Sequence, residues 1–227
     1  LRYVHEGEYR VLIDEESPER QTDYYQRFIK HMANSGSETI TDEGFKEKWM
    51  HTYPLGYVEH RLLWQPGGEV AEWVRKHNSI IKINDTLFVH GGVNPHLPLR
   101  SIKQINKIAK RELLQTPIPV GALIDSADGP LWYRGLANNP EDTELNPMLA
   151  MLEFYGANTI VMGHSPTRGI INPRFDGRAI VIDVGLAAHY GRGMAALLIE
   201  KGKFFAIHRG KKIKLPTHDD QLVDYFK

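Results

Sequence analysis

Two histidines follow apolar stretches that predict buried strands, and their surroundings in the sequence are nearly the same. His90 ends the stretch 86–89 and His164 follows the stretch 159–162, each next to glycine and just before a proline turn. Ligands of α/β proteins gather at the carboxyl ends of strands, and a neutral imidazole nitrogen is a common metal ligand. The pair therefore predicts a metal site, with two unrelated structural histidines as the alternative.

The residues after His90 are two glycines, Gly91 and Gly92, and then an Asn-Pro turn. Because glycine has no side chain, a large or charged group can approach its backbone closely. We expect this group to be a ligand.

An arginine lies in the long stretch 116–143, which is rich in Pro, Gly, Asp and Asn. Long ordered loops within compact domains are often functional, and the guanidinium of Arg134 has the planar fork that binds phosphate through two hydrogen bonds. The alternative is an ion pair of Arg134 with Asp125 or Asp128.

Three further side chains are candidates for the same site. Trp132 and Tyr133 are expected to wedge the loop onto the core or to line the site, with Tyr133 as a candidate substrate contact. Asp183 closes the predicted strand 179–184 and is expected to fix the next turn or to contact substrate.

Composition narrows the function classes. The 28 basic and 28 acidic residues leave a formal net charge of zero, so we predict neither nucleic-acid nor membrane partners, and any phosphate-attracting charge must be local. The absence of cysteine excludes disulfides and a thiolate nucleophile. Any metal is then held by nitrogen and oxygen ligands.

The first third of the chain reads as helical. Ser17 is the expected N-cap of a first helix, with Pro18 as its first residue, and a brief strand is expected at 10–13. Further helices are predicted at 41–51, 57–64 and 69–77. The histidines within this part, His31, His51, His60 and His77, are interpreted as surface or packing residues.

From residue 79 the pattern favours strands. Hairpins are expected at 79–89, around 175–178, and between 194–199 and 204–208, with the basic run 209–214 as a solvated edge. Ser101 and Gln104 predict a capping box that begins an amphipathic helix, and another helix is expected at 145–155.

These motifs together resemble a known family. The runs His90-Gly91-Gly92 and Gly163-His164 resemble the last two metal-ligand motifs of the calcineurin-like metallophosphoesterases. Leu131-Trp132-Tyr133-Arg134-Gly135-Leu136, with Ile182-Asp183-Val184-Gly185, is similar to the phosphoprotein phosphatase branch, and most of all to the Shewanella-like protein phosphatases.

The resemblance implies an α/β fold, a sandwich of two mixed sheets flanked by helices, of which residues 1–227 form one incomplete phosphoesterase domain. Residues 79–209 are its β-rich core, and residues 17–78 are a helical insert expected to act as a cap. The three earlier motifs of the family do not occur in this sequence. The chain is thus expected to be the C-terminal two-thirds of the domain, and its localisation and oligomeric state remain open.

The implied function is hydrolysis of phosphate monoesters, on phosphotyrosine or phosphoserine/threonine of a protein or peptide, by direct attack of a metal-bound hydroxide. The implied cofactors are two divalent ions (Mn, Fe or Zn). His90 and His164 would bind the second ion, Arg134 would clamp the phosphate, and the general-acid histidine would lie upstream. Alternatives are a diadenosine-polyphosphate hydrolase and an inactive binding fragment, and the chain alone is expected to be inactive.

Overall fold

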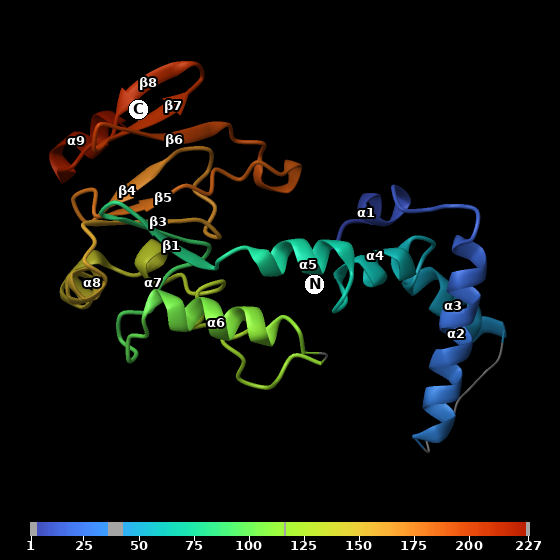
Figure 1. Cartoon of the computed structure of the whole chain (residues 1–227). Coiled ribbons are helices and arrows are strands. Elements are labelled where there is room, and N and C mark those ends of the chain that lie inside the picture. Colours follow the sequence, from blue (N-terminus) through green and yellow to red (C-terminus); the bar gives the residue numbers. More distant parts are fainter. Residues whose placement is uncertain (1–3, 36–42, 116, 226–227) are drawn as a thin grey trace. The chain divides into compact units, whose positions relative to one another are not determined.

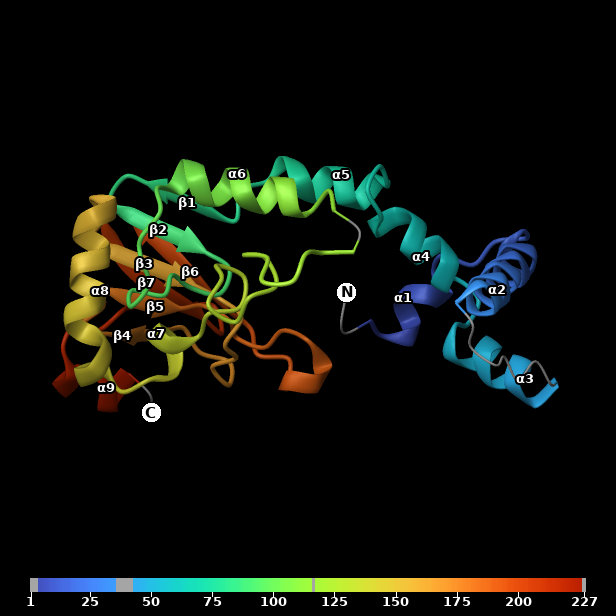
Figure 2. The same cartoon turned by 90° about the horizontal axis from the view of Figure 1, so that it is seen from below.

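The computed structural model describes residues 4–35, 43–115 and 117–225. The chain divides into two compact units, Leu1–Lys76 and His77–Lys227. Among the described helices none is both long and apolar enough to cross a membrane. The helices of the first unit are α1 (Glu6–Arg10), α2 (Ser17–Asn34), α3 (Glu43–Thr52), α4 (Tyr57–Trp64) and α5 (Glu69–Lys76) (Figures 1 and 2).

Aromatic side chains form the core of the first unit. Trp49 of α3 is buried, and its ring centroid lies 5.1 Å from that of Tyr25 and 4.7 Å from that of Tyr53. His60 is only 6% exposed and lies edge-on to Tyr9. This histidine therefore packs in the core, as predicted for the histidines of this part of the chain.

Two predictions for the first unit are wrong at the level of local structure. Residues 10–13 are not a strand: α1 ends at Arg10 and a turn follows, and the described residues 4–35 and 43–76 contain no strand with which they could pair. Ser17 is the first residue of α2 and Glu16 is its N-cap, while the hydroxyl of Ser17 accepts a hydrogen bond from the backbone N–H of Asp14. Thr41, the predicted start of the next helix, lies outside the described residues.

The second unit contains a mixed five-stranded sheet of order β1-β2-β3-β5-β4. The hairpin of β1 (Ile80–Ile83) and β2 (Thr86–Val89) is as predicted, and β2 pairs in parallel with β3 (Thr159–Met162). On the other side of β3, β5 (Ala179–Val181) is parallel to it and antiparallel to β4 (Asn172–Arg174).

A three-stranded antiparallel sheet packs against one face of the first (Figure 1). Its strands are β6 (Ala195–Glu200), β7 (Lys203–His208) and β8 (Lys211–Lys214). The basic run forms β8, whose four residues are all exposed, so it is a solvated edge as predicted. The remaining helices are α6 (Ile102–Glu112), α7 (Gly135–Asn138), α8 (Glu141–Tyr155) and α9 (Asp219–Tyr225).

Successive residues of the central strands point to opposite faces and build two cores. Ile160 of β3 joins Met148 and Met151 of α8 in the core between sheet and helices, whereas the adjacent Val161 joins Ala206 of β7 in the core between the sheets. The α/β fold with two sheets flanked by helices is therefore confirmed.

The predicted loop 116–143 contains α7, and two predicted boundaries in the second unit are wrong because of long-range contacts. The helix α8 begins at Glu141 rather than Leu145, because the carboxylate of Glu141 accepts from the backbone N–H of Phe175 and pairs with Arg174. The strand β5 ends at Val181, since Asp183 already belongs to a turn.

Candidate functional site

The parallel pairing of β2 and β3 places the two histidines side by side. Val89 is opposite Met162 at the ends of the strands, and the pairing continues one residue further because Gly163 donates to the carbonyl of His90 at 2.8 Å. The Nε2 atom of His90 then lies 3.2 Å from the Nδ1 atom of His164. The predicted convergence of the rings is confirmed.

His164 adopts a left-handed backbone conformation, with φ of 60°. Such a conformation is uncommon outside glycine, and it concentrates at functional sites. It forms directly after β3, where the chain turns away from the sheet.

The glycines after His90 have a different role from the one predicted. A Cβ atom on Gly91 would lie 2.9 Å from the backbone of Leu131 and Trp132, and one on Gly92 would lie 3.0 Å from the carbonyl oxygen of Tyr133. The N–H of Gly91 also donates to the carbonyl of Pro130 at 2.8 Å. The group that approaches these glycines closely is thus the loop that carries Arg134.

This loop brings Arg134 onto the histidine pair. The Nη2 atom of Arg134 lies 2.9 Å from the Nε2 atom of His164, and the ring of Trp132 stands edge-on to that of His164 at 5.0 Å. Trp132 is fixed by donation from its Nε1 atom to the carbonyl of Ile124. Asp128, one of the two acids of the alternative interpretation, accepts a hydrogen bond from Asn94.

The hydrogen bonds define where the ring proton of His164 lies. A guanidinium can only donate, so the Nε2 atom of His164 must accept from Arg134. The ring proton of neutral His164 is then on Nδ1, from which it is donated to the Nε2 atom of His90. The three side chains form one directed chain of hydrogen bonds.

The surroundings favour neutral imidazoles. Burial lowers the pKa of His90, opposed by the charge of Asp183 and assisted by that of Arg134. Burial also lowers the pKa of His164, assisted by Arg134 and by His90. Neutral imidazole is the form that binds metals.

The distance between the two nitrogens fits a shared metal ion. The separation of 3.2 Å is less than twice a typical metal–nitrogen bond of about 2.1 Å, so the two nitrogens could be ligands of one ion. Among the described residues, however, no group of three or more His, Cys, Asp or Glu side chains is placed to hold a metal. The pair supplies two ligands of such a site and no more.

The two remaining candidates, Asp183 and Tyr133, have different roles in the structure. Asp183 accepts from the N–H of Gly185 at 3.1 Å, so it fixes the turn, and its charge also acts on both imidazoles. Tyr133 is 7% exposed, and its hydroxyl lies beside Gly135 in the interior. Tyr133 wedges the loop onto the core, and its burial does not favour the predicted contact with substrate.

The sequence analysis missed a carboxylate, Glu144, that joins the segment after β2 to the segment after Arg134. Glu144 is 2% exposed, and it bonds the Nε2 atom of His96 at 2.9 Å and the Nδ2 atom of Asn139 at 2.6 Å. The N–H of His96 in turn donates to Asn94, which bonds Asp128. An acid in the first turn of a helix is ordinary, so nothing local distinguished Glu144.

The fold is similar to that of solved protein tyrosine phosphatases. A cold-active protein tyrosine phosphatase solved at 1.1 Å superposes with a TM-score of 0.57 at 23% identity, over 73% of this chain and 48% of that one. The cold-active protein-tyrosine phosphatase of a psychrophilic Shewanella species gives 0.56 at 21% identity, over 77% and 52%. The chain shares the α/β two-sheet fold of these proteins.

Comparison with curated sequences adds two relatives, although no family model matches the chain. An uncharacterized protein of Schizosaccharomyces pombe, C1840.07c, is 33% identical over 179 residues, which are 72% of this chain and 53% of that protein. Shewanella-like protein phosphatase 1 of Plasmodium berghei is 27% identical over 171 residues, 69% of this chain and 47% of that protein. The chain spans about half the length of these relatives and is related to a protein phosphatase.

Proposed function

We propose that this chain belongs to a metal-dependent protein phosphatase of the calcineurin-like metallophosphoesterase superfamily, which hydrolyses phosphate monoesters of phosphoproteins. The observation that carries the proposal is the convergence of His90, His164 and Arg134 at the ends of two parallel strands. The similarity to Shewanella-like protein phosphatase 1 and the fold shared with the cold-active tyrosine phosphatases support it.

The histidines would hold one divalent ion. Their lowered pKa values keep them neutral and available as ligands near pH 7. A bound divalent ion supplies Lewis acidity and lowers the pKa of water. Asp183, whose charge acts on both rings, would offset part of the positive charge gathered there.

Arg134 would bind the phosphate. Its side chain is exposed and borders the histidine pair, and its planar fork can donate two parallel hydrogen bonds to phosphate oxygens. Fixed donors aimed at developing negative charge are usually a large part of catalysis. Trp132, packed on His164, would hold the ring in place and exclude water from one side of it.

The proposal requires further metal ligands and a general acid from elsewhere, because the described residues add no third ligand to the pair. The same observation favours a second candidate, a binding protein that uses this fold without a metal. Metal content separates the two.

The experiment combines metal analysis with hydrolysis assays. Once the further ligands and the general acid are supplied, the protein is expected to bind manganese and to hydrolyse p-nitrophenyl phosphate and phosphopeptides better than diadenosine tetraphosphate, whereas residues 1–227 alone are expected to be inactive. His90→Asn and His164→Asn should each abolish metal binding and hydrolysis, whereas His31→Asn, an exposed histidine of the first unit, should change neither. Wild-type protein without metal and without activity would support the binding protein, and a preference for the dinucleotide would support the other hydrolase.

A further inference from the structure

A cavity of about 380 Å³ lies in the second unit between α6, the segment 92–100 and the loop 121–130. Aliphatic side chains, among them Val93, Leu99, Ile108 and Leu123, form part of its wall beside polar and charged residues. Ligand pockets typically have volumes of about 300–1,000 Å³ and apolar walls with a few polar groups. The size and lining therefore suit a small apolar group.

Two acids and two arginines line this cavity, and the acids are held by hydrogen bonds from other residues. Glu112 and Asp128 line it, but Glu112 accepts from the N–H of Ile124 and Asp128 accepts from Asn94. Arg100 and Arg111 also line it, are exposed, and make no ion pair within the described ranges 4–35, 43–115 and 117–225. A ligand that carries carboxylates would find two unpaired guanidinium groups there.

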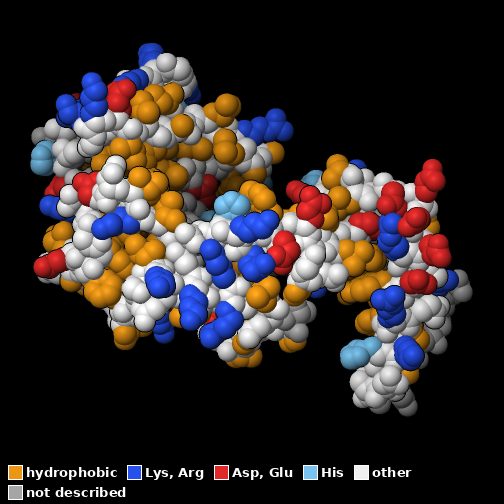
Figure 3. Space-filling view, in the orientation of Figure 1, with side chains coloured by type: hydrophobic (Ala, Val, Ile, Leu, Met, Phe, Trp, Pro, Cys, Tyr) orange, Lys and Arg blue, Asp and Glu red, His pale blue; other side chains and the backbone are white. Residues whose placement is uncertain are grey.

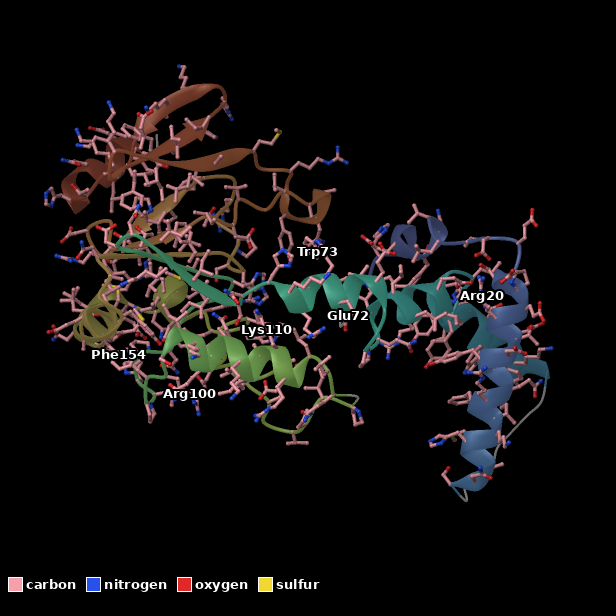
Figure 4. All side chains as sticks on the ribbon, viewed as in Figure 1. Arg20, Glu72, Trp73, Arg100, Lys110 and Phe154 are labelled. Atoms are coloured by element: carbon pink, nitrogen blue, oxygen red, sulfur yellow. The ribbon has the colours of Figure 1, made fainter. Side chains whose placement is uncertain are left out.

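The surrounding surface strengthens this preference. Figure 3 shows Lys and Arg side chains gathered over α6, whose exposed residues include Lys103 and Lys107, and Arg100 lies just before that helix (Figure 4). The chain as a whole has no net charge, so this is a local excess. Such a patch attracts acidic groups at distances of about one Debye length, near 8–10 Å.

The lining favours an aliphatic group over a nucleic-acid base. The one aromatic residue among the described lining residues is Tyr155, whose hydroxyl already donates to the carbonyl of Arg100. Binding of single-stranded nucleic acid relies on several aromatic platforms. An acidic peptide with an aliphatic side chain fits the cavity better.

The cavity also adjoins the candidate site. Gly92 lines it, only two residues after His90, so their Cα atoms lie within about 7 Å of each other. Gly92 also contacts Tyr133, the residue before Arg134. An extended peptide rises about 3.3 Å per residue, so a few residues would connect the two sites.

We propose that the cavity is a docking pocket for an acidic segment of the phosphoprotein substrate. An aliphatic side chain of the segment enters between α6 and the loop 121–130, and its flanking carboxylates pair with Arg100 and Arg111. The proposal rests on the proposed function for its substrate, and it deepens that function by naming what the substrate carries beside its phosphorylated residue.

The test measures binding of a peptide without phosphate, so its outcome does not depend on catalysis. The probe is a fluorescein-labelled peptide with one leucine flanked by aspartates, titrated into the purified protein whose Ile, Leu and Val methyl groups are isotopically labelled. Saturable shifts are expected for Val93, Ile108 and Leu123, but not for Ile199 or Ile213 of the second sheet. Shifts confined to other residues, or no binding up to about 1 mM, would overturn the proposal.

Variants test the chemistry. Arg100→Glu with Arg111→Glu should weaken binding about tenfold or more, because two charge-assisted bonds are lost. The matched control is Lys211→Glu with Lys214→Glu, the same charge change on exposed residues of β8, and should alter binding less than about twofold. If both double variants weaken binding equally, the peptide is attracted by the net charge of the protein rather than by Arg100 and Arg111, and the docking pocket is refuted.

The apolar part of the pocket has its own test. Replacing leucine by glycine in the peptide should weaken binding, and Ile108→Trp should do the same by filling the cavity while both arginines remain. Unchanged affinity in both cases would refute insertion of the side chain. If hydrolysis of phosphopeptides fails but this peptide still binds at the cavity, the pocket binds acidic peptides and its assignment to a phosphoprotein substrate is refuted.

Discussion

Replacing Arg134 by alanine is expected to separate phosphate binding from metal binding at the same site. Arg134 donates to the Nε2 atom of His164, which leaves the ring proton on Nδ1. The Nδ1 atom is the one that faces His90 and would ligate a shared ion. Arg134 thus stabilises the tautomer of His164 that cannot bind the metal.

The magnitude follows from that single hydrogen bond. A bond from a charged donor contributes about 1.5–3 kcal/mol net, and the lower end applies because Arg134 is exposed and screened by solvent. Removing about 1.4 kcal/mol from the competing state corresponds to a factor of about ten in affinity. Arg134→Ala should therefore bind manganese as well as the wild type or up to about tenfold more tightly, and bind inorganic phosphate markedly less tightly.

Calorimetry with manganese and with phosphate measures both affinities, and ¹⁵N NMR of the histidine rings reports the tautomer directly. The metal-free wild type should show His164 protonated at Nδ1, and the variant should show a mixture. Arg134→Lys should rescue phosphate binding poorly, because lysine lacks the planar fork. Loss of metal binding in Arg134→Ala, or protonation at Nε2 in the wild type, would refute the reasoning.

Three further predictions concern acidity, packing and support. Burial lowers the pKa of both His90 and His164 from the ordinary 6.5. Below pH 6.5 the unfolded chain therefore binds more protons than the folded one, and the free energy of unfolding measured with urea should decrease as the pH drops. The two histidines should also retain a metal to a pH below 6.5. Gly91→Ala should cost about 1–3 kcal/mol in the free energy of unfolding, because its Cβ meets the 131–132 backbone, and an unchanged value would contradict the packing role. Glu144→Ala should cost about 3 kcal/mol, because two hydrogen bonds of a buried carboxylate are lost, whereas Glu144→Gln, of nearly the same shape, should cost less.

Local patterns predicted the strands that carry the site. Apolar β-prone stretches ending in histidine became β2 and β3, and their pairing in parallel set His90 beside His164. The capping box of Ser101 and Gln104 also formed as predicted, because each of its hydrogen bonds spans only three residues. Features encoded within a few residues were therefore accessible from sequence.

Features that depend on distant partners were not accessible. The start of α8 follows from the contacts of Glu141 with Arg174 and Phe175, more than thirty positions away. The purpose of Gly91 was misjudged for the same reason, because a glycine that admits a ligand and a glycine that admits another loop look alike in sequence. Only the contact with residues 130–132 distinguishes the two.

The hydrogen bonds among His90, His164 and Arg134 would link the binding of a metal to the binding of phosphate. While Arg134 donates to His164, part of its fork is occupied and the proton of His164 blocks the ligating nitrogen. A metal held by both histidines would require that proton on the Nε2 atom of His164, which could then no longer accept from Arg134. The guanidinium would then be available for an anion. Because coupling between two binding equilibria is reciprocal, phosphate held by Arg134 should in turn favour the tautomer of His164 that binds metal. If the proposed metal site is completed by further ligands, these three residues would couple the binding of the metal to the binding of phosphate.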